Sequence, residues 1–123
     1  MNTDTIEQLF KSYLDAYADI APAERERLLR QSVSDDVVFT NPTGDGKGFS
    51  NLIEHIEGFQ KRAPGGYFRS SQLPTHHGEL LAEWTLYRND GSEFLTGHTF
   101  ARLNEQGRLT HLAGFFKPRA YNQ

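Results

Sequence analysis

The chain has 123 residues, no cysteine, and a formal net charge of -3 with both signs mixed along its length. The lack of cysteine excludes disulfides, thiolate catalysis and cysteine metal sites. The lack of a long basic run argues against nucleic acid as a partner. This length suits one domain, covering residues 1–123, with a core of its own.

Apolar residues recur at helical spacing in three segments of the first half of the chain. The first segment, from Ile6 to Tyr17, predicts an amphipathic helix that buries Tyr13 and Tyr17. A second helix is expected from Pro22, which suits a first turn, to about residue 32. Its charged residues, including Arg25, are expected on a solvated face. A third helix is expected from about residue 50 to 62, ended by Pro64-Gly65-Gly66.

Two short strands are expected around the third helix. Residues 37–40 form the first strand, which ends at Asn41-Pro42 because proline cannot continue the hydrogen-bond ladder. Residues 43–48 lack the spacing of a phosphate-binding loop and are expected to be a plain turn. Residues 67–72 form the second strand.

The stretch from Thr75 to Phe116 predicts three long strands, at about 79–88, 93–103 and 108–116. Asp90-Gly91 predicts a two-residue type I′ turn, which pairs Leu86 with Leu95 and Trp84 with Gly97. If Leu103 pairs with Arg108 across the next turn, Thr99 lies opposite Leu112. With the preceding elements this order predicts an α+β fold, with three helices packed on one face of a curved antiparallel sheet.

Alternation along these strands predicts two different faces. One face is expected to be a lined hollow, because two glycines lie beside large residues on it: Trp84, Gly97, Thr99, Leu112, Gly114 and Phe116. The other face carries Phe100, Leu109 and Phe115. Three large apolar groups on a face that helices do not cover predict a homodimer interface.

Histidine, serine and tyrosine are the candidate carriers of chemistry in this chain. The five histidines show no metal-ligand spacing, so no metal and no cofactor is expected. No serine has the surroundings of a nucleophile elbow. Two readings remain open for Tyr13 and Tyr17: core residues with satisfied hydroxyls, or a hydroxyl that enters the hollow and donates to a ligand oxygen.

Two segments resemble the nuclear transport factor 2-like (NTF2-like) superfamily, in its SnoaL-like and ketosteroid isomerase-like branch. Residues 34–42, SDDVVFTNP, look like the first strand of that family. Residues 97–100, GHTF, followed by 104–109, NEQGRL, look like its penultimate hairpin. The resemblance covers nearly the whole chain and implies a cone-shaped barrel of three helices on a curved, mixed or antiparallel sheet.

The resemblance also implies roles for single residues. Tyr13 matches the oxyanion-binding tyrosine of the isomerase branch. Asn41 stands where that branch has its general base, an Asp, and Thr99 stands where it has a protonated Asp. His77 is expected at the rim of the pocket, by resemblance to a His-His-Gly segment in related sequences. The two replacements argue against an isomerase reaction.

The expected function is binding of a small, largely apolar molecule in a pocket. The expected catalytic residues are Tyr13, Asn41 and His77, and the expected ligand-binding residues are Tyr17, Trp84, Thr99, Leu112 and Phe116. Acid/base chemistry of the isomerase, cyclase or dehydratase type stays open, as does a non-catalytic ligand-binding or protein-interaction module.

The expected cellular location rests on the lack of an early apolar run and of a membrane-spanning stretch. Asp4 and Glu7 interrupt any early apolar run, and no stretch is long and apolar enough to span a bilayer. No membrane contact is therefore expected, and a cytoplasmic protein is the default.

Overall fold

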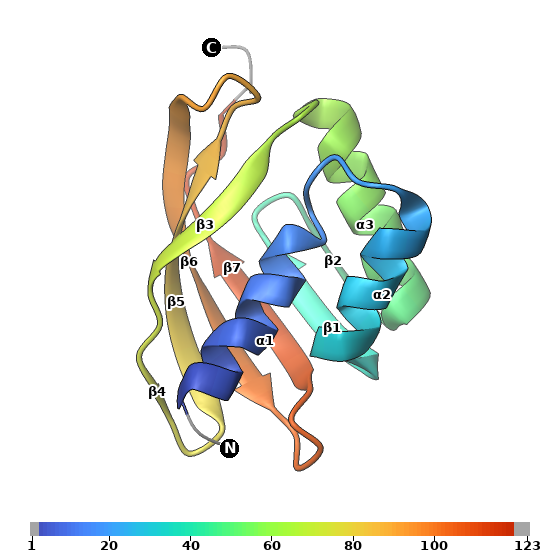
Figure 1. Cartoon of the computed structure of the whole chain (residues 1–123), viewed down its shortest axis with the longest axis vertical. Helices are drawn as coiled ribbons and strands as arrows, with labels where there is room; N and C mark the ends of the chain where they lie inside the picture. Colours follow the sequence, from blue (N-terminus) through green and yellow to red (C-terminus); the bar gives the residue numbers. More distant parts are fainter. Residues whose placement is uncertain (1–2, 120–123) are drawn as a thin grey trace.

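The computed structural model describes residues 3–119, with side chains from Thr5 onward. Within this range lie three helices, α1 (Thr3–Asp15), α2 (Pro22–Ser32) and α3 (Phe49–Arg62) (Figure 1). The strands are β1 (Val33–Asn41), β2 (Gly44–Lys47), β3 (Tyr67–Gln72), β4 (Thr75–His76), β5 (Glu79–Tyr87), β6 (Glu93–Leu103) and β7 (Leu109–Phe115). None of the described helices is both long and apolar enough to cross a membrane.

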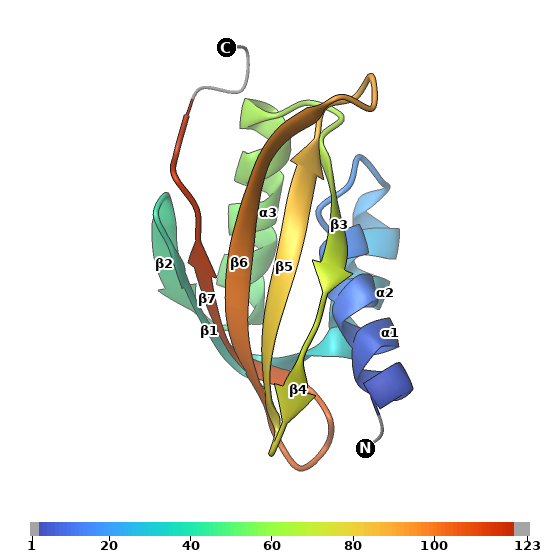
Figure 2. The same ribbon diagram turned by 90° about the vertical axis from the view of Figure 1, so that its left-hand side faces the viewer.

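All seven strands belong to one curved sheet. The order is β2-β1-β7-β6-β5-β3, with β4 paired to β5, and only β1 and β7 run parallel. The helices cover one face of this sheet, and Figure 2 shows the opposite face free of helices. The architecture is the expected α+β arrangement of three helices on a curved, mixed sheet.

The core lies between the helices and the covered face of the sheet. Side chains from α1, α3 and the long strands meet there without solvent contact, among them Phe10, Leu52, Ile56, Leu80 and Leu112. Burying a leucine or phenylalanine stabilises a fold by about 1.5–3 kcal/mol.

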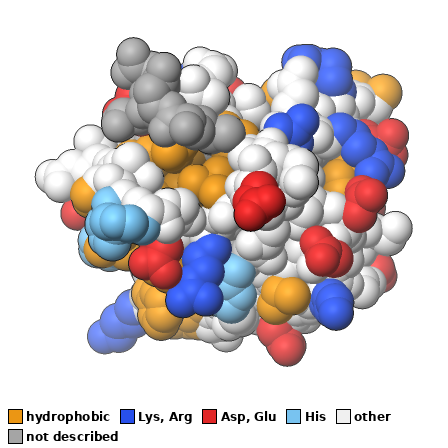
Figure 3. Space-filling model, turned by 90° about the horizontal axis from the view of Figure 1, so that it is seen from below, with side chains coloured by type: hydrophobic (Ala, Val, Ile, Leu, Met, Phe, Trp, Pro, Cys, Tyr) orange, Lys and Arg blue, Asp and Glu red, His pale blue; other side chains and the backbone are white. Residues whose placement is uncertain are grey.

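At the molecular surface seen from below, acidic and basic side chains alternate, so this face gathers no large area of one sign (Figure 3).

The β5–β6 pairing is as predicted, although the turn that joins the strands is not. Leu86 pairs with Leu95 and Trp84 with Gly97. The turn holds three residues, because Arg88 donates its N–H to the carbonyl of Ser92 at 2.8 Å. Gly91, with φ of 87°, is the turn's one residue with positive φ, whereas type I′ needs two. A bulge at Phe94 then restores the predicted register.

The β6–β7 pairing differs from the prediction by two residues. Thr99 pairs with Gly114, not with Leu112. Since side chains alternate with a period of two, this shift leaves Thr99, Leu112 and Gly114 on the predicted face.

The prediction that Leu109 lies on the outer face of the sheet is wrong, because this side chain is fully buried. A register shift beside Leu103, which pairs with Leu109, accompanies this change.

The prediction that Arg25 lies on a solvated face is wrong, because its side chain is only 6% exposed. Its Nε donates to the carbonyl of Ala16 and its Nη2 to that of Ala18, both at 2.9 Å, and so it ties α2 to the end of α1.

Strand β2 forms where a plain turn was expected. Gly-Asp-Gly-Lys has little strand propensity, but β1 provides an antiparallel partner. Gly46 pairs with Phe39, and a Cβ on Gly46 would lie 2.6 Å from Cζ of that ring. The missing side chain therefore makes room for the phenylalanine.

Candidate functional site

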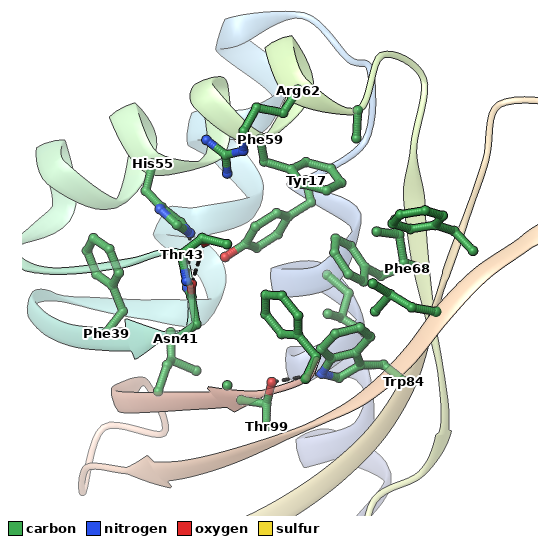
Figure 4. A pocket seen from close by; sticks show the side chains of 18 of the residues that line it. Tyr17, Phe39, Asn41, Thr43, His55, Phe59, Arg62, Phe68, Trp84 and Thr99 are labelled. Atoms are coloured by element: carbon green, nitrogen blue, oxygen red, sulfur yellow. Dashed lines mark hydrogen bonds between the residues drawn. The ribbon is translucent and has the colours of Figure 1, made fainter. Parts of the chain in front are cut away.

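A cavity of about 600 Å³ lies between α1, α3 and the covered face of the sheet (Figure 4). Its lining is mostly apolar and aromatic. It contains seven of the eight predicted site residues: Tyr13, Tyr17, Asn41, Trp84, Thr99, Leu112 and Phe116. The α1 stripe and the inner face of the sheet therefore point at one space, as the alternation patterns predict.

An aromatic wall forms one side of the cavity, built from Phe59, Phe68, Trp84 and Phe116. Phe68 and Trp84 meet edge to face, with ring centroids 5.0 Å apart and planes at 88°. Trp84 and Phe116 follow at 5.8 Å, and Phe59 and Phe68 at 5.1 Å. Such tilted contacts hold rings in fixed places, so the wall is a preformed apolar surface.

Trp84 packs against Gly97. A Cβ at Gly97 would fall 2.6 Å from Cζ2 and Cη2 of the indole, so the predicted close approach at this glycine is made by Trp84 itself. The indole N–H donates to Thr99 Oγ1 at 2.9 Å. Thr99 is 7% exposed, and within the described chain its own hydroxyl proton has no acceptor. That proton is available to a molecule in the cavity.

Tyr13 and Tyr17 form a pair of buried phenols on successive turns of α1 and the loop after it. Their hydroxyl oxygens are 2.9 Å apart. Burial raises the pKa of Tyr17 to about 12, and burial together with Tyr17 raises the pKa of Tyr13 well above 10. Both phenols are therefore neutral near pH 7. One of their two protons joins the oxygens, and the other has no acceptor in the described residues.

Asn41 organises the polar side of the cavity, which we define as Asn41, Thr43, His55 and Arg62. Its Oδ1 accepts the backbone N–H of Thr43 at 2.9 Å and the Thr43 hydroxyl at 2.6 Å. Its Nδ2 lies 3.1 Å from Nε2 of His55. A backbone N–H can only donate, so the amide oxygen must face Thr43 and the amide nitrogen must donate to His55.

The protonation state of His55 follows from that bond. Nε2 accepts a hydrogen and so carries a lone pair, which places the proton of the neutral ring on Nδ1. Burial, and then the positive charge of Arg62, lower the pKa of His55 below 6.5. The imidazole is therefore neutral at pH 7 and presents an N–H group, held in place by the Asn41 amide.

Three of these polar residues, Thr43, His55 and Arg62, were not predicted from the sequence, although a signal existed for the two on α3. His55 lies three residues after Leu52 and four before Phe59, and Arg62 lies three after Phe59. These spacings place both on the face of α3 that turns toward the sheet. His55 has no metal-ligand spacing, and Arg62 belongs to no motif, so only their helical spacing pointed to the cavity.

His77 is the predicted site residue that the structure does not bring to the cavity. It lies in the exposed turn between β4 and β5 with φ of 49°, and its Nδ1 is 3.2 Å from Nδ1 of His76. The β4–β5 turn is at the far end of the sheet from the polar side. Among the described residues there is no group of three His, Asp or Glu side chains that could hold a metal ion.

Comparison with solved structures gives the fold a name. A protein of the SnoaL-like family from Agrobacterium tumefaciens strain C58, proposed to be an isomerase, superposes with a TM-score of 0.86 at 22% identity, covering 94% of this chain and 100% of its own. The chain has the NTF2-like fold. An NTF2-like protein of unknown function from Exiguobacterium sp. 255-15 gives 0.70 at 18% identity, with 86% and 95% covered. A proposed polyketide cyclase from Sinorhizobium meliloti gives 0.69 at 15% identity, with 87% and 93% covered.

No family model and no curated protein matches the sequence. At these identities the structural neighbours establish the NTF2-like fold and leave the function to be argued from the site.

Proposed function

We propose that this NTF2-like chain binds a small, largely apolar molecule in the cavity and orients it through a few fixed hydrogen-bond donors. The observation that carries the proposal is a preformed aromatic space of about 600 Å³ into which donors without protein acceptors converge. Cavities of this size with few placed polar groups are typical of small-molecule sites.

The donors favour a ligand that carries a carbonyl oxygen. The Tyr13–Tyr17 pair has one spare phenolic proton and Thr99 has a spare hydroxyl proton. A carbonyl can accept both, whereas a hydrocarbon leaves both unsatisfied, and a hydrogen bond contributes about 0.5–1.5 kcal/mol net. The resemblance of Tyr13 to an oxyanion-binding tyrosine agrees with this assignment.

The test uses two matched ligands and two matched pairs of tyrosines. 2-Acetylnaphthalene and 2-ethylnaphthalene differ in a carbonyl, and binding is followed by the indole N–H resonance of Trp84, the single tryptophan. We expect both to bind and the ketone to bind about two- to tenfold more tightly. The double change Tyr13→Phe/Tyr17→Phe should reduce that preference, because only the Thr99 hydroxyl proton then remains for the carbonyl.

The matched control is Tyr67→Phe/Tyr87→Phe, which removes two hydroxyls from a stacked tyrosine pair that does not line the cavity. This control should keep the ketone preference. If neither naphthalene moves the Trp84 resonance or the melting temperature, the proposal fails.

Acid/base chemistry on the bound molecule is the second candidate, and His55 is the observation that favours it. A neutral imidazole held in a cavity can carry a proton to or from a ligand. Its Nε2 lone pair is already occupied by Asn41, however, and none of the described lining residues is an Asp or Glu. We therefore propose that proton transfer between carbons is slow in this protein.

This second candidate is tested with a simple β,γ-unsaturated ketone. A positioned general base is worth about 10²–10⁴-fold in rate, so Asn41→Asp should raise isomerisation at least tenfold, and adding Tyr13→Phe should reduce the gain. Asn51→Asp makes the same change at an exposed asparagine of α3 and should give no gain. Wild-type turnover as fast as that of Asn41→Asp would contradict the view that Asn41 limits the reaction.

A further inference from the structure

Arg62, whose side chain is also exposed to solvent, brings a positive charge to the rim of the cavity, and no described residue pairs with it. It lines the polar side and makes no hydrogen bond or ion pair with any residue that the structure describes. The second arginine of the lining, Arg119, is held by the protein. Its Nη1 donates to the carbonyl of Phe94 at 3.1 Å, and its guanidinium lies 4.6 Å from the centroid of that ring.

The direction of the Arg62 side chain follows from the position of this residue in α3. The residue is in the last turn of the helix, and its side chain folds back toward the helix N-terminus, the direction in which helical side chains tilt. Gly58, one turn earlier, leaves room for it, since a Cβ there would lie 3.3 Å from Nη1 of Arg62. Figure 4 shows the guanidinium pointing into the cavity, between His55 and Tyr17.

The surroundings of Arg62 contain donors but no negative charge. Among the described lining residues, none is an Asp or Glu. Asn41 already accepts two hydrogen bonds from Thr43, and its nitrogen donates to His55 Nε2, so neither of these two side chains offers Arg62 a free acceptor. A guanidinium with five N–H donors, placed beside further donors, is a site for an acceptor that carries negative charge.

We propose that the ligand of this cavity carries a carboxylate, which Arg62 binds on the polar side while the apolar skeleton lies against the aromatic wall. This inference rests on the proposed function and names the ligand class: apolar carboxylic acids. A carboxylate matches the planar fork of one guanidinium and its single charge. On the polar side, as defined above, a phosphate dianion would face one arginine, and the other groups there are neutral.

If Arg62 served only to stabilise the end of α3, its substitution would have a different effect on ligand binding. A cation in the last turn of a helix is favoured by the helix dipole, and Lys61 stands in the same turn. If that were the whole role of Arg62, removing either charge would leave ligand selection unchanged. Lys61 does not line the cavity, so it is the matched control.

The experiment measures the affinities of 1-naphthylacetate, 1-naphthylacetamide and 1-naphthyl phosphate by calorimetry, with the Trp84 indole N–H resonance as the site reporter. The first two share one skeleton and differ in charge. We expect the wild type to bind the acetate at least about tenfold more tightly than the amide, as suits a charge-assisted bidentate pair. Arg62→Gln should abolish this preference and leave the amide affinity within about twofold.

Each further result supports or overturns the inference. Lys61→Gln should keep the preference, and Arg62→Lys should keep part of it. An amide that binds as tightly as the acetate in the wild type overturns the carboxylate assignment but leaves the proposed function standing. A phosphate that binds more tightly than the acetate, through Arg62, also overturns it. If none of the three perturbs Trp84, the proposed function and this inference fail together.

Discussion

At the residue scale, one hydrogen bond ties the charge of His55 to the folded state. The Asn41 amide donates to Nε2, so protonating the ring would set two N–H groups against each other. Burial and the charge of Arg62 act in the same direction and lower the pKa of His55 below 6.5. The unfolded chain has none of these effects, and its histidines bind protons more readily.

This difference predicts a pH dependence of stability. Below pH 6.5 the unfolded chain takes up a proton that folded His55 still resists, so the free energy of unfolding falls as the pH falls. The contribution is fully present above pH 6.5 and is lost toward the lower folded-state pKa. Urea unfolding at pH 7.5, 6.5 and 5.5 should show the decline.

The matched variant is His55→Gln, which keeps a donor and acceptor but cannot titrate. It should make the decline between pH 7.5 and 5.5 shallower. An NMR titration that places the pKa of folded His55 above 6.5 would contradict the direction of the effect. So would an unchanged slope in the variant.

At the element scale, the sequence predicted the strands and their faces better than their exact pairing. Alternation placed Trp84, Thr99 and Leu112 on one face, and that conclusion survives any shift by two residues. The β5–β6 pairing was predicted correctly although the three-residue turn and the bulge at Phe94 were both missed, because their effects on register cancel. Bulges depend on packing against the rest of the fold, which local patterns do not record.

The polar side of the cavity was harder to predict for a related reason. Helical periodicity shows which face His55 and Arg62 share, but the contact between His55 and Asn41 joins residues 14 positions apart on different elements. Strand β2 was missed because its Gly-Asp-Gly-Lys sequence has low strand propensity, and tertiary pairing with β1 overrides it.

Gly97 and Gly58 allow a matched test of these packing arguments. Gly97→Ala sets a methyl group 2.6 Å from the Trp84 ring and 2.8 Å from the carbonyl of Phe115, and backbone cannot move aside. Overpacking of this kind costs about 1–3 kcal/mol. We expect a lower melting temperature and a shifted Trp84 indole resonance.

The same substitution in α3 should have the opposite sign. Gly58→Ala meets only the flexible tip of Arg62 at 3.3 Å, and alanine in a helix interior is favoured over glycine by about 0.5–1 kcal/mol. Its melting temperature should rise. A Gly97→Ala protein as stable as the wild type would show that Trp84 is free to move.

At the scale of the whole molecule, the two faces of the sheet differ in how they are covered. The inner face is closed by the helices and holds the cavity. The outer face has no helix over it, yet it carries Leu81 at 47% and Phe115 at 61% exposure, with the half-buried Phe100 paired to Leu81. An antiparallel face that meets water usually alternates to polar residues.

We predict that a second copy of the chain covers this outer face, defined by Leu81, Phe100 and Phe115. Two carboxylates beside it already have contacts within one chain: Glu79 forms an ion pair with Arg102 at 3.2 Å, and Glu83 lies 3.4 Å from the imidazole of His98. The apolar groups between those pairs gain most from leaving water. Sedimentation velocity at micromolar concentration should show a dimer, and dilution should lower its melting temperature.

Phe115→Lys would bury a charge in the interface and should give a monomer with the fold intact. Gln31→Lys adds the same charge on the exposed side of α2 and should leave the dimer unchanged. A wild-type monomer at these concentrations would refute the prediction, and a dimer that survives Phe115→Lys would place the interface on another face.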